Sequence, residues 1–233
     1  MLLISRGAYT LFDLGSGALR QLSRIGISHE RISKILITHF HPDHTADLIH
    51  FLFATRSPDV LKRRAPFLLL GPLGFSEFLE GLQRPYGKWL KVPADIMGLD
   101  ELDISRPDGR EYSDFAVLSQ PLPHTPQSIA YRVEGPSGAT FVYSGDTGYS
   151  NELIEFARDT DLLVTECSFP DGGPVEGHLT PSEAGRIAAQ AHVKRLLLVH
   201  FYPGVLATDI SMGCRRAFKG ELILGQDFMH LEV

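Results

Sequence analysis

The sequence predicts a layered α/β fold in which helices cover the outer faces of β-sheets. Predicted strands alternate with predicted helices in both halves of the chain, which is the pattern of layered α/β architecture. Histidines and aspartates gather where predicted strands end, and α/β folds carry their chemistry at such positions. The chain has 233 residues, of which 43% are hydrophobic, enough for a sizeable core in one large domain or two fused halves.

In the first half, short apolar runs predict strands at residues 9–14, 32–38 and 67–70. The run at 32–38 is rich in β-branched residues and short enough to be a buried strand. Helices are expected at 18–25, 46–54 and 75–90. In the second of these, Leu48, Phe51 and Leu52 fall on one side at helical spacing.

The second half predicts short strands at 115–118, 129–133, 141–144, 162–165 and 196–199. Helices are expected at 152–158 and 181–192, the latter with Pro181 near its first turn. The tail predicts one helix around 208–218 and two short strands.

Composition excludes several classes of protein. The net charge is −6 with no long basic run, which argues against a protein that coats nucleic acid but permits local binding of a phosphate-bearing end. Cys167 and Cys214 form no CxxC pair, so a reducing compartment fits, and Cys167 is expected to be a small buried hydrophobe. No apolar run reaches membrane-spanning length, and the N-terminus lacks signal-peptide features. We therefore expect a cytoplasmic protein with no membrane partner.

The motif HFHPDH supplies four metal-binding groups within six residues: His39, His41, Asp43 and His44. Zinc is bound by imidazole nitrogens and carboxylate oxygens. His39 and His41 are two apart and point to the same side of an extended backbone, while Asp43 and His44 follow the turn at Pro42 and face a second point. The alternative is a polar strand-to-helix loop in which Asp43 caps the helix.

Further ligands must come from elsewhere in the chain, because one loop leaves each metal incomplete. His124, Asp146 and His200 each follow a predicted strand. Alone, each would more often be structural or solvated. Together they complete two metal sites with no ligand left over.

This ordered set of residues resembles the metallo-β-lactamase superfamily over nearly the whole chain. The resemblance implies a single domain over 1–233 with a four-layer αβ/βα sandwich fold. It assigns His39, His41 and His124 to a first metal ion, Asp43, His44 and His200 to a second, and Asp146 to a bridging position. Two divalent ions are expected, with zinc preferred and manganese or iron also suited to these ligands. They would share a bridging hydroxide as nucleophile, oriented by Asp43, and the resemblance also suggests a homodimer.

Family members usually have a strand and a loop before the segment that matches residues 9–17. This chain begins almost on that segment. We therefore expect that the first sheet lacks an N-terminal edge strand, or that the start codon is misassigned.

A second stretch is similar to ribonuclease Z and its relatives, in which a histidine paired with an acidic residue protonates the leaving oxygen. Glu166 and His178 match those positions, and a histidine suits general acid catalysis near neutral pH. The alternative is that His178 caps the helix that begins near Pro181. Asp146 also stands where several true β-lactamases have cysteine, which argues against antibiotic hydrolysis.

One departure from the ribonuclease Z pattern narrows the range of expected substrates. Ribonuclease Z enzymes usually carry a long arm, inserted between the residues matching His124 and Asp146, that binds transfer RNA. In this chain only 21 residues separate those two positions. We therefore expect a phosphodiesterase that acts on a small phosphodiester or an RNA end. The basic residues Lys62, Arg63 and Arg64 are expected in a solvated loop, with phosphate contact as the alternative.

Two rival functions stay open at the level of the sequence. The same metal site could hydrolyse a carboxylic ester, thioester, lactone or sulfate ester. Alternatively, the protein could be a binding scaffold with structural metals, although seven ligands over two ions leave open positions that structural zinc sites lack. The remaining histidines have no partner motif and are expected on the surface or in the core: His29, His50, His192 and His230.

Overall fold

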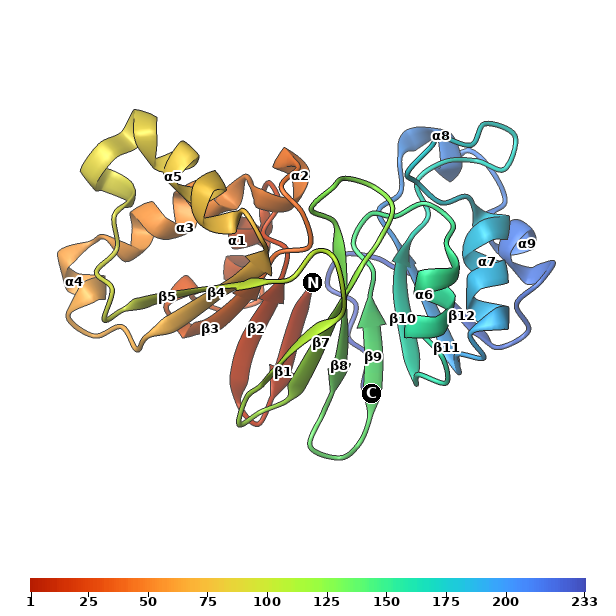
Figure 1. Ribbon diagram of the computed structural model, residues 1–233, viewed down its shortest axis with the longest axis horizontal. Helices are drawn as coiled ribbons and strands as arrows, with labels where there is room; N and C mark the ends of the chain where they lie inside the picture. Colours follow the sequence, from red (N-terminus) through yellow and green to blue (C-terminus); the bar gives the residue numbers. More distant parts are fainter. The chain divides into compact units, whose positions relative to one another are not determined.

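The computed structural model describes residues 1–233, and the chain forms two compact units, Met1–Asp103 and Ile104–Val233. Each unit has one β-sheet with helices packed on it (Figure 1). None of the helices is long and apolar enough to span a membrane.

The first unit contains a five-stranded sheet in the order β1-β2-β3-β4-β5. The strands are β1 (Leu2–Ser5), β2 (Ala8–Phe12), β3 (Ile32–Leu36), β4 (Phe67–Pro72) and β5 (Met97–Leu102). β1 pairs antiparallel with β2, and the other neighbours are parallel. The strand β1 therefore precedes the segment that begins at Tyr9. The prediction that the first sheet lacks an N-terminal edge strand is wrong.

The helices of the first unit are α1 (Ala18–Arg24), η1 (His29–Arg31), α2 (Pro42–Thr45), α3 (Asp47–Thr55), α4 (Pro58–Leu61), α5 (Phe75–Tyr86) and η2 (Gly87–Leu90). α3 has the predicted amphipathic spacing, and its Leu48, Phe51 and Leu52 are fully buried. They pack in one apolar cluster with residues of β3 and β4, including Ile35 and Leu69. This core fixes the loop between β3 and α3, which carries the HFHPDH motif.

The helix predicted over 75–90 is two elements. Glu101 of β5 accepts hydrogen bonds from the backbone N–H groups of Gly74 and Ser76, which satisfies donors at the start of α5. α5 ends at Tyr86 because Gly87 adopts a positive φ of 55°, which leaves the helical conformation and which glycine tolerates. The chain then continues as the 3₁₀ turn η2.

Arg64 belongs neither to a solvated loop nor to a phosphate site. Its side chain is buried and donates to the carbonyl oxygens of His29 and Ile32. Burial lowers the pKa of Arg64 to about 10. Only Lys62 and Arg63 of this basic cluster are exposed.

The second unit contains a seven-stranded sheet in the order β12-β11-β10-β9-β8-β7-β6. The strands are β6 (Asp108–Glu111), β7 (Ala116–Pro121), β8 (Ile129–Glu134), β9 (Thr140–Tyr143), β10 (Leu162–Glu166), β11 (Arg195–Val199) and β12 (Glu221–Leu224). β6 to β9 are antiparallel, whereas β9 to β12 run parallel. The carboxyl ends of β9, β10 and β11 thus meet at one edge, where Glu166 ends β10 and the loops that carry Asp146 and His200 begin.

The helices of the second unit are α6 (Asn151–Phe156), α7 (Pro181–Gln190), α8 (Pro203–Leu206) and α9 (Ile210–Arg215). α6, α7 and α9 lie on the same side of the sheet (Figure 1). Ile187 of α7, Leu163 of β10 and Cys214 of α9 belong to one buried cluster, as does Cys167. Cys167 is therefore buried, as expected.

Two predictions for the second unit differ in outcome. The 21 residues between His124 and Asp146 contain two strands and a turn, β8 and β9, as the spacing predicts. The prediction of two strands in the tail is wrong, because only β12 forms and residues 225–233 contain no strand.

Candidate metal centre

In the first unit, the HFHPDH loop connects β3 to α2. His41 is the N-cap residue of α2, and Pro42 occupies its first turn. Asp43 lies inside that turn, and its side chain is 51% exposed. Asp43 therefore does not cap the helix, and its carboxylate is accessible to solvent.

The three histidines of this loop lie against one another. The ring centroid of His39 is 4.7 Å from that of His41 and 4.2 Å from that of His44. The ligand atoms of His39 and His41 lie within 4.8 Å of each other, as do those of Asp43 and His44. Local backbone geometry thus forms the two pairs that the motif predicts.

Asp13 is a functional candidate that sequence analysis missed. Its buried carboxylate accepts hydrogen bonds from His44 Nδ1 at 2.8 Å and from the Thr38 N–H at 2.8 Å. The Thr38 hydroxyl donates to Asp13 and lies 3.0 Å from His39 Nδ1. Burial alone would raise the pKa of Asp13, but the hydrogen bond and charge of His44, together with the Thr38 hydrogen bond and His39, hold that pKa below its ordinary value. One carboxylate therefore orients two histidine rings.

Gly15 allows the HFHPDH loop to approach the turn after β2. A Cβ atom at this position would lie 1.8 Å from the carbonyl oxygen of Asp43. The neighbouring Leu14 exchanges backbone hydrogen bonds with His44 and Asp47. Any side chain at Gly15 would force the loop away.

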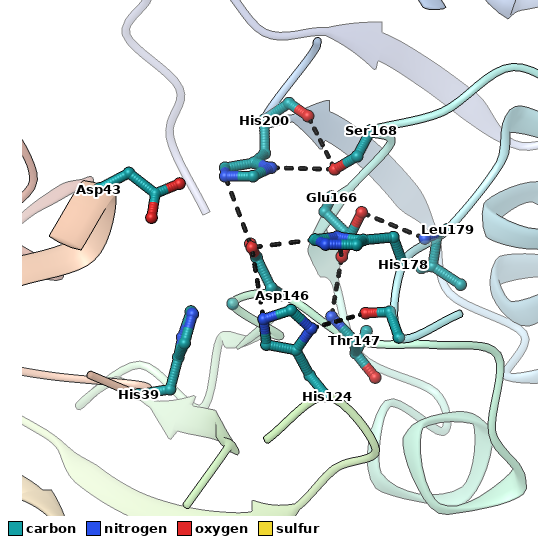
Figure 2. A network of polar contacts seen from close by, with 12 residues as sticks. His39, Asp43, His124, Asp146, Thr147, Glu166, Ser168, His178, Leu179 and His200 are labelled. Carbon is teal, nitrogen blue, oxygen red and sulfur yellow. Dashed lines mark hydrogen bonds and ion pairs between the residues drawn. The ribbon is translucent and has the colours of Figure 1, made fainter. Parts of the chain in front are cut away.

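In the second unit, Asp146 lies between two predicted ligands. Its Oδ2 atom is 3.9 Å from His124 Nε2 and 3.5 Å from His200 Nε2. Figure 2 shows these two rings and that of His178 arranged around the Asp146 carboxylate. The unit thus brings together all three ligands that the sequence predicts in this part of the chain.

Hydrogen bonds fix the orientation of these rings. His124 Nδ1 lies 2.8 Å from the carbonyl oxygen of Gly177, which can only accept, so Nδ1 carries the proton. Ser168 donates its hydroxyl to the carbonyl oxygen of His200 and thus accepts from His200 Nδ1 at 2.9 Å. Ser168 is a second contributor that sequence analysis missed, because its contact with His200 forms only when β11 pairs with β10.

His178 and Glu166 form the predicted pair. His178 Nδ1 lies 2.9 Å from Glu166 Oε1, and the Glu166 carboxylate also accepts from the backbone N–H groups of Thr147 and Leu179. Thr180, not His178, caps α7 in a reciprocal arrangement with Glu183. The capping alternative for His178 is therefore excluded.

The donor set fits divalent metal ions. In neutral histidine one ring nitrogen donates and the other accepts, and a metal-binding histidine usually donates its other N–H to a carboxylate, carbonyl or similar acceptor. His39, His44, His124 and His200 all have Nδ1 beside such an acceptor. Their Nε2 atoms then carry the lone pair that a metal needs.

Comparisons with known proteins agree with this chemistry. Residues 10–201 match the family described as "Beta-lactamase superfamily domain". The chain is 32% identical over 212 residues to the protein Rv1339 of Mycobacterium tuberculosis, covering 90% of this chain and 76% of that protein. It is 28% identical over 268 residues to ribonuclease Z of Thermoplasma acidophilum, covering 96% and 86%.

Among solved structures, the metallo-β-lactamase fold protein YhfI of Bacillus subtilis matches with a TM-score of 0.83. The sequence identity is 24%, and the match covers 97% of this chain and 88% of YhfI. This likeness confirms the predicted fold.

Proposed function

This chain belongs to the β-lactamase superfamily, and from that membership we propose that it is a binuclear metal-dependent phosphodiesterase. The observation that carries the proposal is the shared orientation of four histidine rings, His39, His44, His124 and His200, each with Nδ1 bound to an acceptor. A histidine with a purely structural role does not require Nδ1 on an acceptor and the lone pair on Nε2.

The proposed ligands come from both units. The first ion would be held by His39, His41 and His124, the second by Asp43, His44 and His200, with Asp146 shared between them. The position of Asp146 Oδ2 near both His124 Nε2 and His200 Nε2 supports a shared carboxylate. Zinc is the proposed metal, and manganese or iron would suit the same oxygen and nitrogen donors.

When bound, the two ions would supply an activated water and neutralise charge that develops at phosphorus. Residues of the chain would orient the attacking water and protonate the leaving oxygen. Asp43, with its accessible carboxylate, would orient the attacking water. As the bond from phosphorus to the leaving alcohol breaks, His178 would give that oxygen a proton from Nε2, while Glu166 holds Nδ1–H and stabilises the charged ring.

A small phosphodiester or an RNA end is the proposed substrate. The ribonuclease Z relative supports phosphodiester chemistry, and the hairpin of β8 and β9 between His124 and Asp146 supports a substrate without a large RNA body. The cytoplasmic location, the homodimer and the single domain remain predictions from the sequence.

Hydrolysis of bis(p-nitrophenyl) phosphate tests the proposed activity. We expect turnover by the metal-loaded protein, loss of turnover with a chelator, and loss in Asp43→Ala. His230→Ala, which changes an exposed histidine with no proposed role, is the matched control and should keep full activity. Absence of diester hydrolysis in the metal-loaded protein would refute the proposal.

His178→Ala tests whether His178 protonates the leaving oxygen. A general acid contributes about 10²–10⁴-fold when the leaving group is a poor one. The variant should therefore lose that factor in kcat with alkyl leaving groups but little with p-nitrophenolate. Equal losses with both leaving groups would show that His178 does not protonate the leaving oxygen.

A further inference from the structure

A cavity of about 690 Å³ opens beside His124 and His178. All its lining residues belong to the second unit. Its volume lies within the range of roughly 300–1,000 Å³ that is typical of small-molecule sites. His178 is the residue proposed to protonate the leaving oxygen, so this cavity adjoins the leaving-group side of the reaction.

The cavity walls are three loops tied to one another. The Gly148 N–H donates to the carbonyl oxygen of Pro123 at 2.8 Å, and His124 Nδ1 donates to the carbonyl oxygen of Gly177 at 2.8 Å. A Cβ atom at Gly148 would lie 3.4 Å from Gly177 and from Pro123. These two hydrogen bonds and the van der Waals contact at Gly148 connect the loops after β7, β9 and β10 to one another.

Apolar and aromatic groups make up much of the lining, including Pro126, Pro174, Val175 and Tyr149. Tyr149 is fixed from two sides, because the guanidinium of Arg186 lies 4.6 Å from its ring centroid and its hydroxyl donates to Gln190. A rigid aromatic ring of this kind suits a flat organic group.

The charges around the cavity are acidic. Glu176 and Glu183 line it, and no lysine or arginine does. Glu183 is occupied at the start of α7, where it accepts from Thr180, so exposed Glu176 is the carboxylate that an occupant would meet. The guanidinium of Arg186 lies against Tyr149 and 3.9 Å from Glu183, so a phosphate beside Glu176 would face a carboxylate that no lysine or arginine of the lining offsets.

We propose that this cavity binds the leaving group of the diester and selects an uncharged nucleoside over a phosphate-bearing RNA chain. The inference rests on the proposed function, since it takes His178 as the proton donor to the leaving oxygen. The substrates would be diesters whose leaving alcohol is a neutral nucleoside.

A matched set of substrates tests the selection. A dinucleoside monophosphate is compared with the same molecule carrying one extra terminal phosphate, first on the leaving nucleoside and then on the retained one, as assigned by product analysis. We expect the extra phosphate to lower kcat/KM at least about tenfold on the leaving nucleoside and by less than about threefold on the retained one. Equal or faster turnover with a phosphorylated leaving nucleoside would overturn the proposal.

Glu176→Lys should reverse this preference, so that the substrate with a phosphorylated leaving nucleoside becomes the better one. Glu134→Lys makes the same change of charge at an exposed position of β8 outside the cavity and should leave the preference as it is. If the two variants behave alike, net charge rather than this cavity sets the preference.

Tyr149→Ala tests the aromatic wall. It should raise KM about tenfold for the dinucleoside monophosphate but little for a nucleoside methyl phosphodiester that releases methanol. Calorimetric titration of the metal-loaded protein with a free nucleoside should show the same weakening without any turnover. An unchanged KM and nucleoside affinity in Tyr149→Ala would contradict the proposal, while hydrolysis of bis(p-nitrophenyl) phosphate reports separately on the proposed function.

Discussion

Histidine orientation is the residue-scale feature that distinguishes this protein from an ordinary α/β domain. The four oriented rings use three kinds of acceptor: the Asp13 carboxylate for His44, a backbone carbonyl for His124, and a hydroxyl for His39 and for His200. Acceptors of this kind raise ligand basicity and fix the tautomer, and their loss typically lowers metal affinity 10–100-fold. Asp13 matters most among them, because it binds the His44 ring directly and the His39 ring through Thr38.

Asp13→Asn should therefore lower metal affinity by about 10–100-fold, measured by competition with a chromogenic chelator. Asp59→Asn removes an exposed carboxylate in α4 and is the control that should leave the affinity unchanged. Unaltered affinity in Asp13→Asn would show that Asp13 does not support the ligands.

The metal-free protein should also show a pH signature of Asp13. The folded-state pKa of Asp13 is below its ordinary value because the hydrogen bond and charge of His44, together with the Thr38 hydrogen bond and His39, outweigh burial. The stabilisation is thus complete above the unfolded pKa of about 3.9 and is lost as pH falls toward the folded pKa. Urea unfolding should show a gap in the free energy of unfolding between wild type and Asp13→Asn that is present from pH 7 to about 5 and shrinks below about 4. A gap that persists unchanged at low pH would contradict this assignment.

The sequence predicted the metal-type residues but not Asp13. The HFHPDH motif places four metal-binding groups within six residues, and histidine and aspartate at strand ends supply the further predicted ligands. Asp13 lies just before a Gly-Ser-Gly turn, and no predicted metal ligand lies near it in the sequence. Its role arises only because β2 pairs with β3, which places its carboxylate beside Thr38 and His44.

At the scale of elements, the contact between α7 and α9 holds the helical layer of the second unit. A Cβ atom at Gly185 would lie 2.4 Å from the carbonyl oxygen of Cys214, so the helices approach at a point where only glycine fits. α7 also follows the loop that carries His178. Close packing here therefore positions one end of that loop.

Gly185→Ala and Gly81→Ala form a matched pair. Both residues lie inside helices, but a Cβ atom at Gly81 would meet nothing within 4 Å. We expect Gly185→Ala to lower the free energy of unfolding by about 1–3 kcal/mol through overpacking. Gly81→Ala should raise it by roughly 0.5–1 kcal/mol through helix propensity. Urea denaturation measures both, and a stabilised Gly185→Ala would show that α7 and α9 do not pack as described.

Buried strands were predicted from the sequence, whereas the edge strands β1, β5 and β6 were not. β3, β4, β10 and β11 stand out as apolar runs because neighbours cover them on both sides. β5 (MGLDEL) and β6 (DGRE) lie at sheet edges, where backbone pairing suffices and side chains can be polar. The end of α5 was missed for another reason, since Gly87 breaks a helix whose apolar spacing continues to Leu90.

At the scale of the whole molecule, each unit carries an incomplete set of ligands. The first unit supplies His39, His41, Asp43 and His44, and the second supplies His124, Asp146 and His200. No single unit offers the complete set that the proposed function assigns to either ion. The proposed function therefore requires that residues from both units hold the same two ions.

Metal content of three variants, measured on purified protein by mass spectrometry of the bound metal, tests this claim most directly. Wild type should bind two zinc ions per chain. His41→Ala, from the first unit, and His124→Ala, from the second, should each lose one ion. Because both residues are assigned to the same ion, the double variant should also retain one, a non-additive result. A double variant that retains none would mean that the two residues serve separate ions and would contradict the account.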